Sequence, residues 1–307
     1  MPNISIIVPA YNEMRFIEQT LTRLQEVTRA SGISCEIIVV DNGSTDRTAS
    51  LAEQIENVKV LKLGNRHRIS EARNAGAVEA KGALLAFIDA DVLVTKAWVD
   101  NLHRRFAQLA QSDTVTGAQY RISENPGWIE RYWFKAMEER RPNYINGGNV
   151  VIGKKLFIRV GGFCADLVTA EDVEFCKRAR KKGAIVDPDP MFAVHHEGYP
   201  KNLRSFFKRE LWTGRGDFSS LRTFVESKTA LTAVIVTLLL AASVGFLLFG
   251  QWLTSLSLAM IVIAMSMASV KYKYGVQSVE HFLVNTGVML VHLVARAFAF
   301  LSIEKKA

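Results

Sequence analysis

Four short apolar segments, rich in isoleucine and valine, stand out in the first part of the 307-residue chain. None of them alternates with polar residues, which is typical of strands buried on both faces of a parallel sheet. They are Ile4–Val8, Glu36–Val40, Val58–Leu63 and Leu84–Ile88. This pattern predicts a sheet that other elements cover on both sides.

The stretches between these segments have the spacing of helices. Apolar residues recur every three or four positions between Phe16 and Thr28, and Thr48–Ile55 follows a Ser/Thr/Asp cluster that can cap a helix. Strand–helix–strand alternation predicts an α/β sheet with right-handed crossovers.

Two further helices are expected later in the chain. Trp128–Met137 has helical spacing and an aromatic face, which suits either packing on the core or contact with a membrane interface. Glu171–Lys182 carries acidic residues at its start and basic residues at its end, as the helix dipole prefers.

The composition changes near residue 225. The 42 residues from Thr229 to Val270 include no charged side chain, and as one helix they would extend about 60 Å, twice the thickness of a bilayer core. We therefore expect two membrane spans, about 229–249 and 252–270, after a soluble domain over 1–225. A third apolar stretch, 282–303, contains His292 and Arg296, which leaves two alternatives: a third span in the membrane region 226–307, or a helix along the interface.

The net charge of +8 arises partly from basic residues that cluster just before the apolar tract. They are Lys201, Arg204, Lys208, Arg209, Arg215, Arg222 and Lys228. A juxtamembrane basic cluster marks the cytoplasmic side and attracts anionic lipids, so the expected partner is a phospholipid bilayer and no nucleic acid. The N-terminus has no secretory signal pattern, and three scattered cysteines suit a reducing compartment. We expect a multi-pass protein of the inner (cytoplasmic) membrane, with its soluble domain facing the cytoplasm.

Polar clusters follow three of the predicted strands. They are Tyr11-Asn12-Glu13, Asp41-Asn42-Gly43-Ser44-Thr45-Asp46 and Asp89-Ala90-Asp91. Ligands of open α/β sheets lie beyond the carboxyl ends of the strands, so these clusters would share one edge. Each cluster alone matches ordinary turn chemistry, and their coincidence at one edge is what indicates a site.

The chemistry of these side chains fits a sugar nucleotide. Tyr11 and Asp41 offer an aromatic wall and an acceptor for a nucleoside. Asp89 and Asp91 offer carboxylates for a divalent metal, Mg²⁺ or Mn²⁺, which would act as a Lewis acid on a departing diphosphate. Arg73 offers a positive charge there. No G-x-G-x-x-G follows the first strand and no Walker lysine loop exists, which argues against dinucleotide oxidoreductases and P-loop enzymes.

The ordered motifs resemble family 2 glycosyltransferases over about residues 1–200. The motifs are Pro9-Ala10-Tyr11-Asn12-Glu13, Val40–Asp46, Ala72-Arg73-Asn74-Ala75-Gly76, Asp89-Ala90-Asp91, Asn146-Gly147-Gly148-Asn149, Val160-Gly161-Gly162-Phe163 and Glu171-Asp172. The resemblance implies a GT-A fold, a Rossmann-like and mostly parallel mixed sheet, and inverting transfer from a UDP- or GDP-linked sugar. It also implies nucleotide-sugar binding by Pro9, Tyr11, Asn12, Glu13, Asp41, Ser44, Arg73, Asp89, Ala90, Asp91 and Asn149, with Asp91 the more direct metal ligand.

The pair Glu171-Asp172 matches the position of the family's catalytic acids. An inverting displacement needs a general base for the acceptor hydroxyl, and the resemblance assigns that role to Asp172. Without the resemblance, the same pair would be explained by its place at a helix N-terminus.

His195-His196 follows an expected strand, Met191–Val194, where family members often carry a histidine. Adjacent residues of a strand point to opposite faces, so only one of the two can reach a metal, and we expect that residue to be His196. A surface histidine with no such role is the alternative.

Arg209–Gly216 stands where processive synthases carry Q-x-x-R-W, but no Gln precedes Arg209 by three residues and Trp212 is displaced. An amphipathic interfacial helix explains this segment equally well. The expected function is metal-dependent sugar transfer to a membrane-associated acceptor, a lipid-linked saccharide or another hydroxyl, in cell-surface glycan or exopolysaccharide synthesis. A polyprenyl-phosphate sugar transferase is one alternative, and a non-catalytic membrane scaffold that retains the fold is another.

Overall fold

The computed structural model describes residues 3–138 and 143–302. The chain forms two compact units. The N-terminal unit consists of Met1–Glu124 and Arg140–Tyr199, and the helical unit consists of Asn125–Glu139 and Pro200–Ala307. The helical unit thus begins before residue 225, where we expected the membrane region to start, and it includes the aromatic segment around Trp133. Whether the domains 1–225 and 226–307 fold independently stays a prediction.

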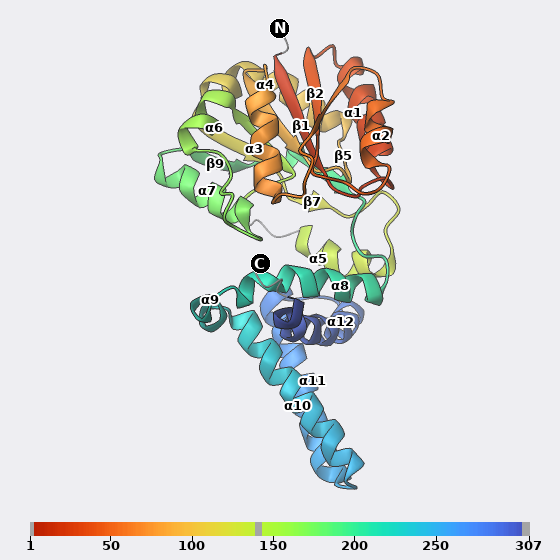
Figure 1. The fold of residues 1–307 in the computed structure, drawn as a ribbon. Coiled ribbons are helices and arrows are strands. Elements are labelled where there is room, and N and C mark those ends of the chain that lie inside the picture. The colour runs from red at the N-terminus through yellow and green to blue at the C-terminus, as the bar shows by residue number, and fades with distance from the viewer. Residues whose placement is uncertain (1–2, 139–142, 303–307) are drawn as a thin grey trace. The chain divides into compact units, whose positions relative to one another are not determined.

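The N-terminal unit is built on a seven-stranded sheet in the order β3-β2-β1-β4-β8-β6-β9 (Figure 1). The strands are β1 (Ile4–Ala10), β2 (Cys35–Asp41), β3 (Val58–Lys62), β4 (Leu84–Ile88), β6 (Thr114–Gly117), β8 (Asn149–Gly153) and β9 (Ile185–Pro188). The strands β1, β2, β3 and β4 run parallel to one another, and β8 runs antiparallel to both β4 and β6. The α/β fold with a mixed, mostly parallel sheet is therefore confirmed.

Helices cover both faces of this sheet. Successive residues of a strand face opposite sides, so Ile6 and Val8 of β1 join one core cluster while Ile7 joins the other. The first cluster includes α1 (Ile17–Ala30), α2 (Thr48–Glu53) and α4 (Lys96–Gln111). The second includes α3 (Ile69–Glu79), α6 (Lys154–Val160) and α7 (Glu171–Lys181). Complete burial explains why β1 and β4 lack polar alternation, whereas the edge strand β3 is only partly buried and exposes Lys59 and Lys62.

A second, three-stranded sheet has the order β5-β10-β7. Its strands are β5 (Val92–Leu93), β7 (Tyr120–Arg121) and β10 (Val194–His196). The strand expected at Met191–Val194 is wrong, because Pro190–Phe192 forms a 3₁₀ turn (η2) that the Asp189 side chain caps. The strand begins instead at Val194, which places both histidines inside it.

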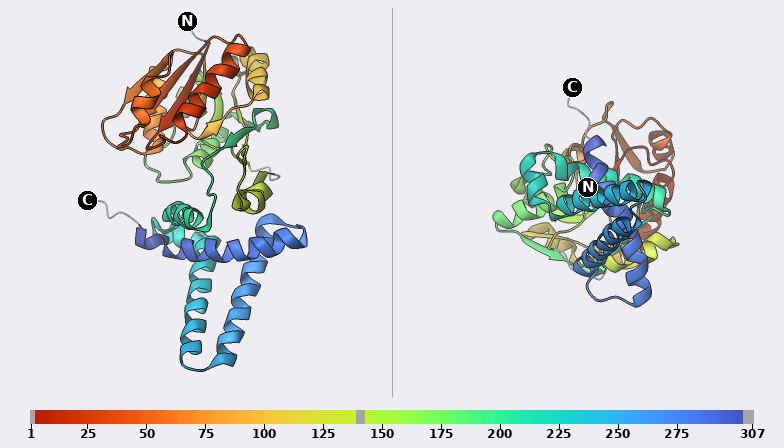
Figure 2. Two further views of the ribbon diagram at one scale, coloured as in Figure 1. Left: turned by 90° about the vertical axis from the view of Figure 1, so that its right-hand side faces the viewer. Right: turned by 90° about the horizontal axis from the view of Figure 1, so that it is seen from below.

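The helical unit contains one short aromatic segment and a series of helices (Figure 2). The aromatic segment forms a π-helix, η1 (Glu130–Phe134), followed by α5 (Lys135–Glu138), and it buries Trp133 and Phe134. The remaining elements are α8 (Leu203–Thr213), η3 (Gly214–Phe218), α9 (Leu221–Glu226), α10 (Lys228–Leu248), α11 (Trp252–Tyr274), α12 (Val279–Ala297) and η4 (Phe298–Ser302).

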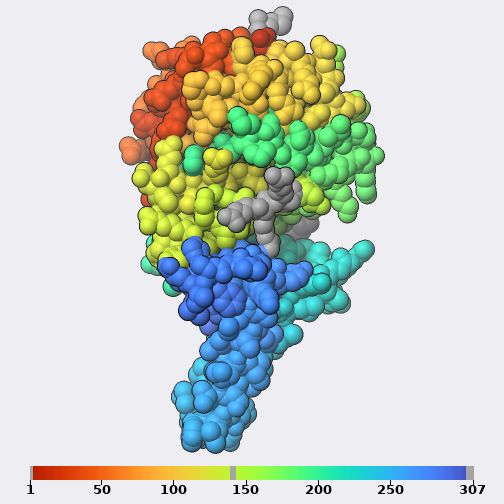
Figure 3. All heavy atoms as spheres, turned by 180° about the vertical axis from the view of Figure 1, so that it is seen from behind, coloured from red at the N-terminus to blue at the C-terminus, as the bar shows by residue number. Residues whose placement is uncertain are grey.

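The two expected spans, 229–249 and 252–270, correspond to α10 and α11, which pack together as a hairpin around Gly250. Gly250 has a left-handed φ of 75°, which a tight turn between helices needs. Three helices of the described chain are long and apolar enough to cross a membrane, the third being Val279–Leu301. In Figure 3 the side chains near the tip of the α10–α11 hairpin are uncovered on the face shown.

Candidate active site

The loop after β1 interlocks with the loop after β2. The Asn12 backbone N–H donates to Ser44 Oγ (3.0 Å), and the Asn12 side chain accepts from the Thr45 N–H (2.8 Å). Asn12 has a left-handed φ of 56°, which asparagine tolerates better than most residues. Glu13 N–H donates to Thr48 Oγ1 (2.8 Å). The two polar clusters expected to share an edge of the sheet therefore do so.

A cation–π contact lies beside these loops. The Arg66 guanidinium lies over the Tyr11 ring, 4.4 Å from its centroid. Asp41, the last residue of β2, is buried beside the pair of loops and accepts from the Ser44 N–H (3.3 Å). Pro9 lies within β1, opposite Val40. Tyr11, Asp41 and Ser44 thus lie in the two interlocked loops at this edge, and their part in nucleoside binding stays a prediction.

Arg73 of α3 lies between two carboxylates. Its guanidinium donates to Asp89 Oδ1 (2.8 Å) and to Glu171 Oε1 (2.7 Å), and its side chain is only 2% exposed. Asp89 and Glu171 raise the pKa of Arg73 above its ordinary value. We expected Arg73 to act on a diphosphate, but its guanidinium is occupied by these two acids. Its position suits orienting Asp89 and Glu171.

The two glycines of Asn146-Gly147-Gly148-Asn149 allow this arrangement. A Cβ at Gly148 would lie 2.0 Å from Asp89 Cγ, and one at Gly147 would lie 2.8 Å from Arg73 Nη1. No other residue fits at either place without moving the buried pair. The motif therefore has a packing role around Asp89 and Arg73.

Asn149 is part of the buried core of the N-terminal unit. It is fully buried, its Oδ1 accepts from Trp98 Nε1 (2.9 Å), and its Nδ2 donates to the carbonyls of Ala118 (3.0 Å) and Phe192 (2.7 Å). These contacts are structural, and the expected part of Asn149 in nucleotide-sugar binding stays a prediction. Its amide joins β8 to the loops around the second sheet.

Tyr120 belongs to the site, although it is absent from the residues expected there. Its hydroxyl donates to Asp89 Oδ2 (2.8 Å) and accepts from the Gly148 N–H (3.0 Å). Burial and the Asp89 charge raise the pKa of Tyr120 well above 10.0. Its strand is only two residues long, so no periodic pattern identified it. Asp89 thus has one oxygen on Arg73 and the other on Tyr120.

Asp91 faces His196 across the second sheet. His196 Nε2 lies 3.5 Å from Asp91 Oδ2, and the His196 ring packs on Tyr120 and Tyr199. The neighbouring His195 turns away, with its Nδ1 2.8 Å from the Ile122 carbonyl. Of the two adjacent histidines, the one that we expected to reach the metal is the one beside Asp91. Ala90, between the two acids, is buried and its carbonyl accepts from Thr20.

A divalent cation fits the chemistry of this corner, with few protein ligands. Among the described residues, no group of three or more Asp, Glu, His or Cys side chains is arranged around one point. Asp91 and His196 make a pair, and His196 Nδ1 is buried without a hydrogen-bond partner. Burial, followed by the charges of Asp91, Asp89 and Asp46, raises the pKa of Glu13 to about 8. A hard cation would offset part of the negative charge of these carboxylates, with diphosphate oxygens and water as its remaining ligands.

Asp172 lies at the start of α7, next to Glu171. Its Oδ2 accepts from the Gly147 N–H (3.2 Å) and its Oδ1 from the Val173 N–H (2.8 Å). Burial, followed by the charge of Glu171, raises the pKa of Asp172 from 3.8 to about 6. Ala170, the N-cap residue of α7, has a left-handed φ of 63°, an uncommon conformation for alanine. A carboxylate with this pKa can accept a proton near neutral pH.

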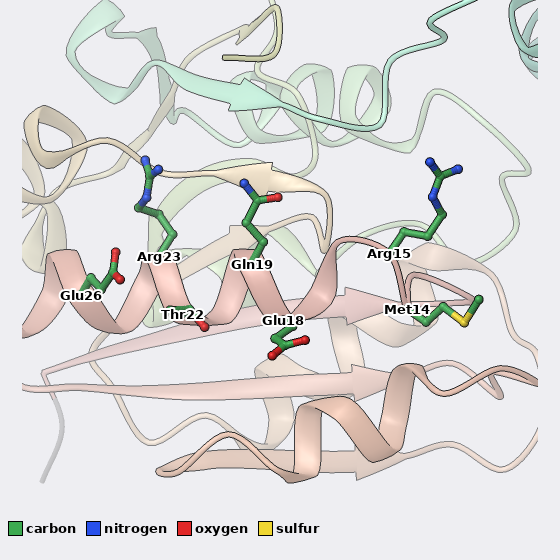
Figure 4. Close-up of a pocket in the computed structure, with 7 residues that line it drawn as sticks. All are labelled: Met14, Arg15, Glu18, Gln19, Thr22, Arg23 and Glu26. Carbon is green, nitrogen blue, oxygen red and sulfur yellow. The ribbon is translucent and has the colours of Figure 1, made fainter. Parts of the chain in front are cut away.

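A separate surface hollow runs along α1 (Figure 4). It is lined by Met14, Arg15, Glu18, Gln19, Thr22, Arg23 and Glu26. Its lining includes none of the predicted site residues, and Arg23 within it pairs with Glu124 (3.0 Å). The hollow is therefore distinct from the cluster around Asp89 and Asp91.

Comparison with known proteins places the matched region on this same unit. Residues 5–168 match the family described as Glycosyl transferase family 2. Glycosyltransferase AglE of Haloferax volcanii is 30% identical over 195 residues, which are 60% of this chain and 63% of that protein. Validoxylamine A glucosyltransferase of Streptomyces hygroscopicus is 33% identical over 126 residues, 39% of this chain and 29% of that protein. The chain thus spans less than two thirds of the length of either relative.

One solved structure resembles the chain over nearly its whole length. The mannosyltransferase PcManGT from Pyrobaculum calidifontis, solved with GDP-Man and Mn²⁺, matches with a TM-score of 0.59 at 18% identity. The match covers 98% of this chain and 87% of that one. At this identity the likeness concerns the fold, and it agrees with the GT-A fold expected from the motifs.

Proposed function

Because the chain belongs to glycosyl transferase family 2, we propose that it transfers a sugar from a nucleoside diphosphate donor to an acceptor at a membrane. The observation that carries the proposal is the gathering of Tyr11, Asp41, Asp91, His196 and Asp172 in the N-terminal unit, around the edge formed by the ends of β1, β2 and β4. These groups together meet the needs of a nucleoside, a diphosphate and an acceptor.

The donor would bind with its base against Tyr11 and Asp41. Asp91 and His196 would hold a divalent cation, Mg²⁺ or Mn²⁺, and Asp89 would keep its orientation through Arg73 and Tyr120. A bound cation supplies Lewis-acid stabilisation for the leaving diphosphate. The Mn²⁺ in the structure of PcManGT supports a divalent cation as the cofactor of this fold.

Asp172 would act as general base toward an acceptor hydroxyl in an inverting transfer. Two backbone N–H groups fix its carboxylate, while its raised pKa of about 6 keeps it a competent proton acceptor at neutral pH. An acceptor that is already anionic, such as a polyprenyl phosphate, would need no such base. The placement of Asp172 therefore favours a hydroxyl acceptor, and the phosphate acceptor becomes an outcome of the test.

The acceptor would be membrane-associated, because α10 and α11 provide a candidate anchor of two apolar helices. The basic residues between Lys201 and Lys228 favour a cytoplasmic position for the N-terminal unit at an inner membrane. Anchoring raises the local concentration of a lipid-linked acceptor. Cell-surface glycan or exopolysaccharide synthesis is the process that this arrangement would serve.

The proposal can be tested first by binding and then by transfer. Ligands that bind only the folded state raise its apparent stability, so UDP- and GDP-linked sugars should raise the unfolding temperature of the full chain, more strongly with Mn²⁺. Transfer to lipid-linked saccharides in membranes should fall by about 10² to 10⁴ in Asp172→Asn. Asp91→Asn should abolish the Mn²⁺ effect. The matched control is Asp100→Asn, in an exposed ion pair on α4. It should change neither the Mn²⁺-dependent rise in unfolding temperature nor the rate of transfer.

Each negative outcome has its own meaning. Absence of any shift with nucleotide sugars would overturn the proposed donor. Full activity of Asp172→Asn on a polyprenyl phosphate, with none on a hydroxyl acceptor, would favour the phosphate-acceptor alternative. Nucleotide binding that persists in a chain with no transfer to either acceptor class would favour the scaffold alternative.

A further inference from the structure

A buried carboxylate joins two helices of the helical unit. Glu210 of α8 is 2% exposed, and its oxygens contact His292 Nδ1 (2.9 Å), Arg296 Nε (3.3 Å) and Arg209 Nη1 (2.9 Å). His292 and Arg296 both belong to α12. Arg296 also donates from Nη1 to Asp217 Oδ2 (3.0 Å) in η3. The C-terminal half of α12 is therefore tied to α8 and η3 by a network of charges.

Close backbone packing supports this attachment. A Cβ at Gly214, at the junction of α8 and η3, would lie 2.7 Å from Ala299 Cβ and 3.0 Å from Arg296 Cδ. Gly214 is buried there. The charge network therefore lies inside a packed contact between α8, η3, α12 and η4.

The other end of α12 is tied to η1. The Tyr132 hydroxyl donates to Glu280 in the first turn of α12, and Asn285 Nδ2 donates to the Tyr132 carbonyl (3.0 Å). Positions 280 and 296 of a helix are separated by about 24 Å, most of the thickness of a hydrocarbon core. Both ends of α12 thus contact elements that carry charged side chains.

These two attachments lie on the same side of any membrane. η1 and α8 contact each other directly, since Trp133 packs edge-on against Phe206 (5.2 Å between centroids) and Lys201, just before α8, pairs with the fully buried Glu130 (2.6 Å). If α12 crossed the bilayer, one of its ends would have to leave this joined pair. The contacts are compatible only with an α12 whose two ends stay on one side.

The fraction of buried residues also distinguishes α12 from α10 and α11. Within the most apolar window, 17% of residues are buried in α10 and 22% in α11, against 44% in the helix that begins at Val279. α12 packs on α8, α10 and α11, and it lies across the hairpin in the ribbon view (Figure 2). A charged cluster such as that around Glu210 would be expensive in the bilayer core.

We propose that α12 is a helix of the membrane surface and not a third span. The chain then crosses the bilayer twice, through α10 and α11, and Leu301 returns to the side on which α10 enters. The partner of this layer is the headgroup region of a phospholipid bilayer, into which the exposed apolar residues Leu283 and Phe300 would dip while Arg204 and Lys208 of α8 meet anionic headgroups. This inference rests on the membrane association proposed above.

The experiment compares three single-cysteine variants of the full chain after its three native cysteines are replaced by alanine. Gln251→Cys lies at the tip of the α10–α11 hairpin, Val276→Cys lies in the turn before α12, and Leu301→Cys lies after α12. Val276 and Leu301 are 99% and 67% exposed, so both sites are open to reagent. A membrane-impermeant maleimide is applied to spheroplasts and, separately, to inverted membrane vesicles.

We expect the Gln251→Cys variant to be labelled from one side of the membrane, and the Val276→Cys and Leu301→Cys variants from the other. Labelling of Leu301→Cys on the same side as Gln251→Cys would overturn the inference while leaving membrane association intact. Recovery of the protein in the soluble fraction would instead contradict the membrane association itself.

If the cysteine-free chain fails to fold, fusions to the full native chain give the same answer. A C-terminal fluorescent protein that folds only in the cytoplasm should be bright, and a C-terminal alkaline phosphatase that needs the periplasm should be inactive. The reverse pair of results, with an N-terminal fluorescent fusion that is bright, would contradict the two-span arrangement, since the two ends of the chain would then lie on opposite sides.

Discussion

Among the described residues, each unit has a buried charge held by several side chains, and the two charges have opposite sign. In the N-terminal unit a buried cation, Arg73, is held by Asp89 and Glu171. In the helical unit a buried anion, Glu210, is held by His292, Arg296 and Arg209. In both networks these partners offset part of the cost of burying the charge.

The two networks differ in where their outer members lie. The side chains of Asp89 and Glu171 are 21% and 14% exposed and lie at the candidate site, beside Tyr120 and Asp172. The outer members of the Glu210 network, Arg296, Asp217 and Arg209, are 16%, 23% and 40% exposed, but they belong to the packed helices α12, η3 and α8. We therefore expect the first network to orient groups for a ligand and the second to fasten helices. The following changes should separate these two roles.

The largest combined effect is expected for Arg73→Met. Removing one partner of a buried pair leaves an uncompensated charge and costs about 3–5 kcal/mol. Asp89 and Glu171 would also lose their orientation, and a displacement of about 1 Å can lower a rate about 100-fold. Both kcat/KM for sugar transfer and the hydrogen-exchange protection of β4 and α7 should fall.

The variant Arg73→Lys sharpens this test. Lysine retains the charge but cannot donate to two carboxylates in the planar geometry of a guanidinium. We expect it to restore more of the stability than of the activity. Equal recovery of both would contradict an orienting role for Arg73.

The matching change in the other network is Glu210→Ala, which should have a similar effect on stability alone. It leaves Arg296 and His292 without their buried carboxylate, at a cost of about 3–5 kcal/mol, and α12 should lose protection against hydrogen exchange. Nucleotide-sugar binding to the purified chain, measured by calorimetry in detergent, should stay unchanged. Loss of binding together with full protection of α12 would contradict the division of roles.

Much of the sheet could be predicted because its signal is local. The apolar segments from Ile4 to Ile88 matched β1, β2, β3 and β4 within one or two residues. For β1, β2 and β4 the reason is burial on both faces, which leaves few polar interruptions, whereas the edge strand β3 exposes Lys59 and Lys62 and was found from its apolar residues. The same holds for α10 and α11, whose lengths follow from the uncharged tract. The strand expected at Met191–Val194 failed because a proline and an Asp cap formed a turn there.

Only those site residues that directly follow a predicted strand could be placed from the sequence. The partners of Arg73 come from residues 16 and 98 positions away, and Tyr120 reaches Asp89 from a two-residue strand. The complete burial of Asn149 could not be predicted either, because its position in a motif gives no sign of the residues that pack around it. Long-range pairing of this kind depends on the folded topology.

A smaller effect, graded with pH, is expected for Asp172. Its folded pKa is raised to about 6, so the carboxylate that accepts a proton is present above pH 6 and is lost as the pH falls. The rate of transfer to a hydroxyl acceptor should fall about tenfold per pH unit below about pH 6. Because the charged form is the disfavoured one in the folded state, Asp172→Asn should also stabilise the N-terminal unit above pH 6.

The readout is kcat/KM between pH 5 and 8 with saturating Mn²⁺, beside the residual activity of Asp172→Asn over the same range. The acidic limb should be present in the native chain and absent from the variant. If kcat/KM falls at acidic pH in both the native chain and Asp172→Asn, the titrating group is not Asp172, and another residue must act as the general base.

The smallest effect is expected where a charge pair lies outside both networks. Arg222 and Glu226 of α9 form an i,i+4 pair at 2.8 Å, but their side chains are 86% and 64% exposed. Exposed pairs of this kind contribute at most about 0.5 kcal/mol because water and salt screen them. Glu226→Ala should therefore leave the unfolding temperature, the protection of α12 and sugar transfer within experimental error. A loss of stability comparable to that of Glu210→Ala would show that the cost of breaking an ion pair in this protein does not depend on its burial. Burial could then not explain the effects expected for Arg73 and Glu210.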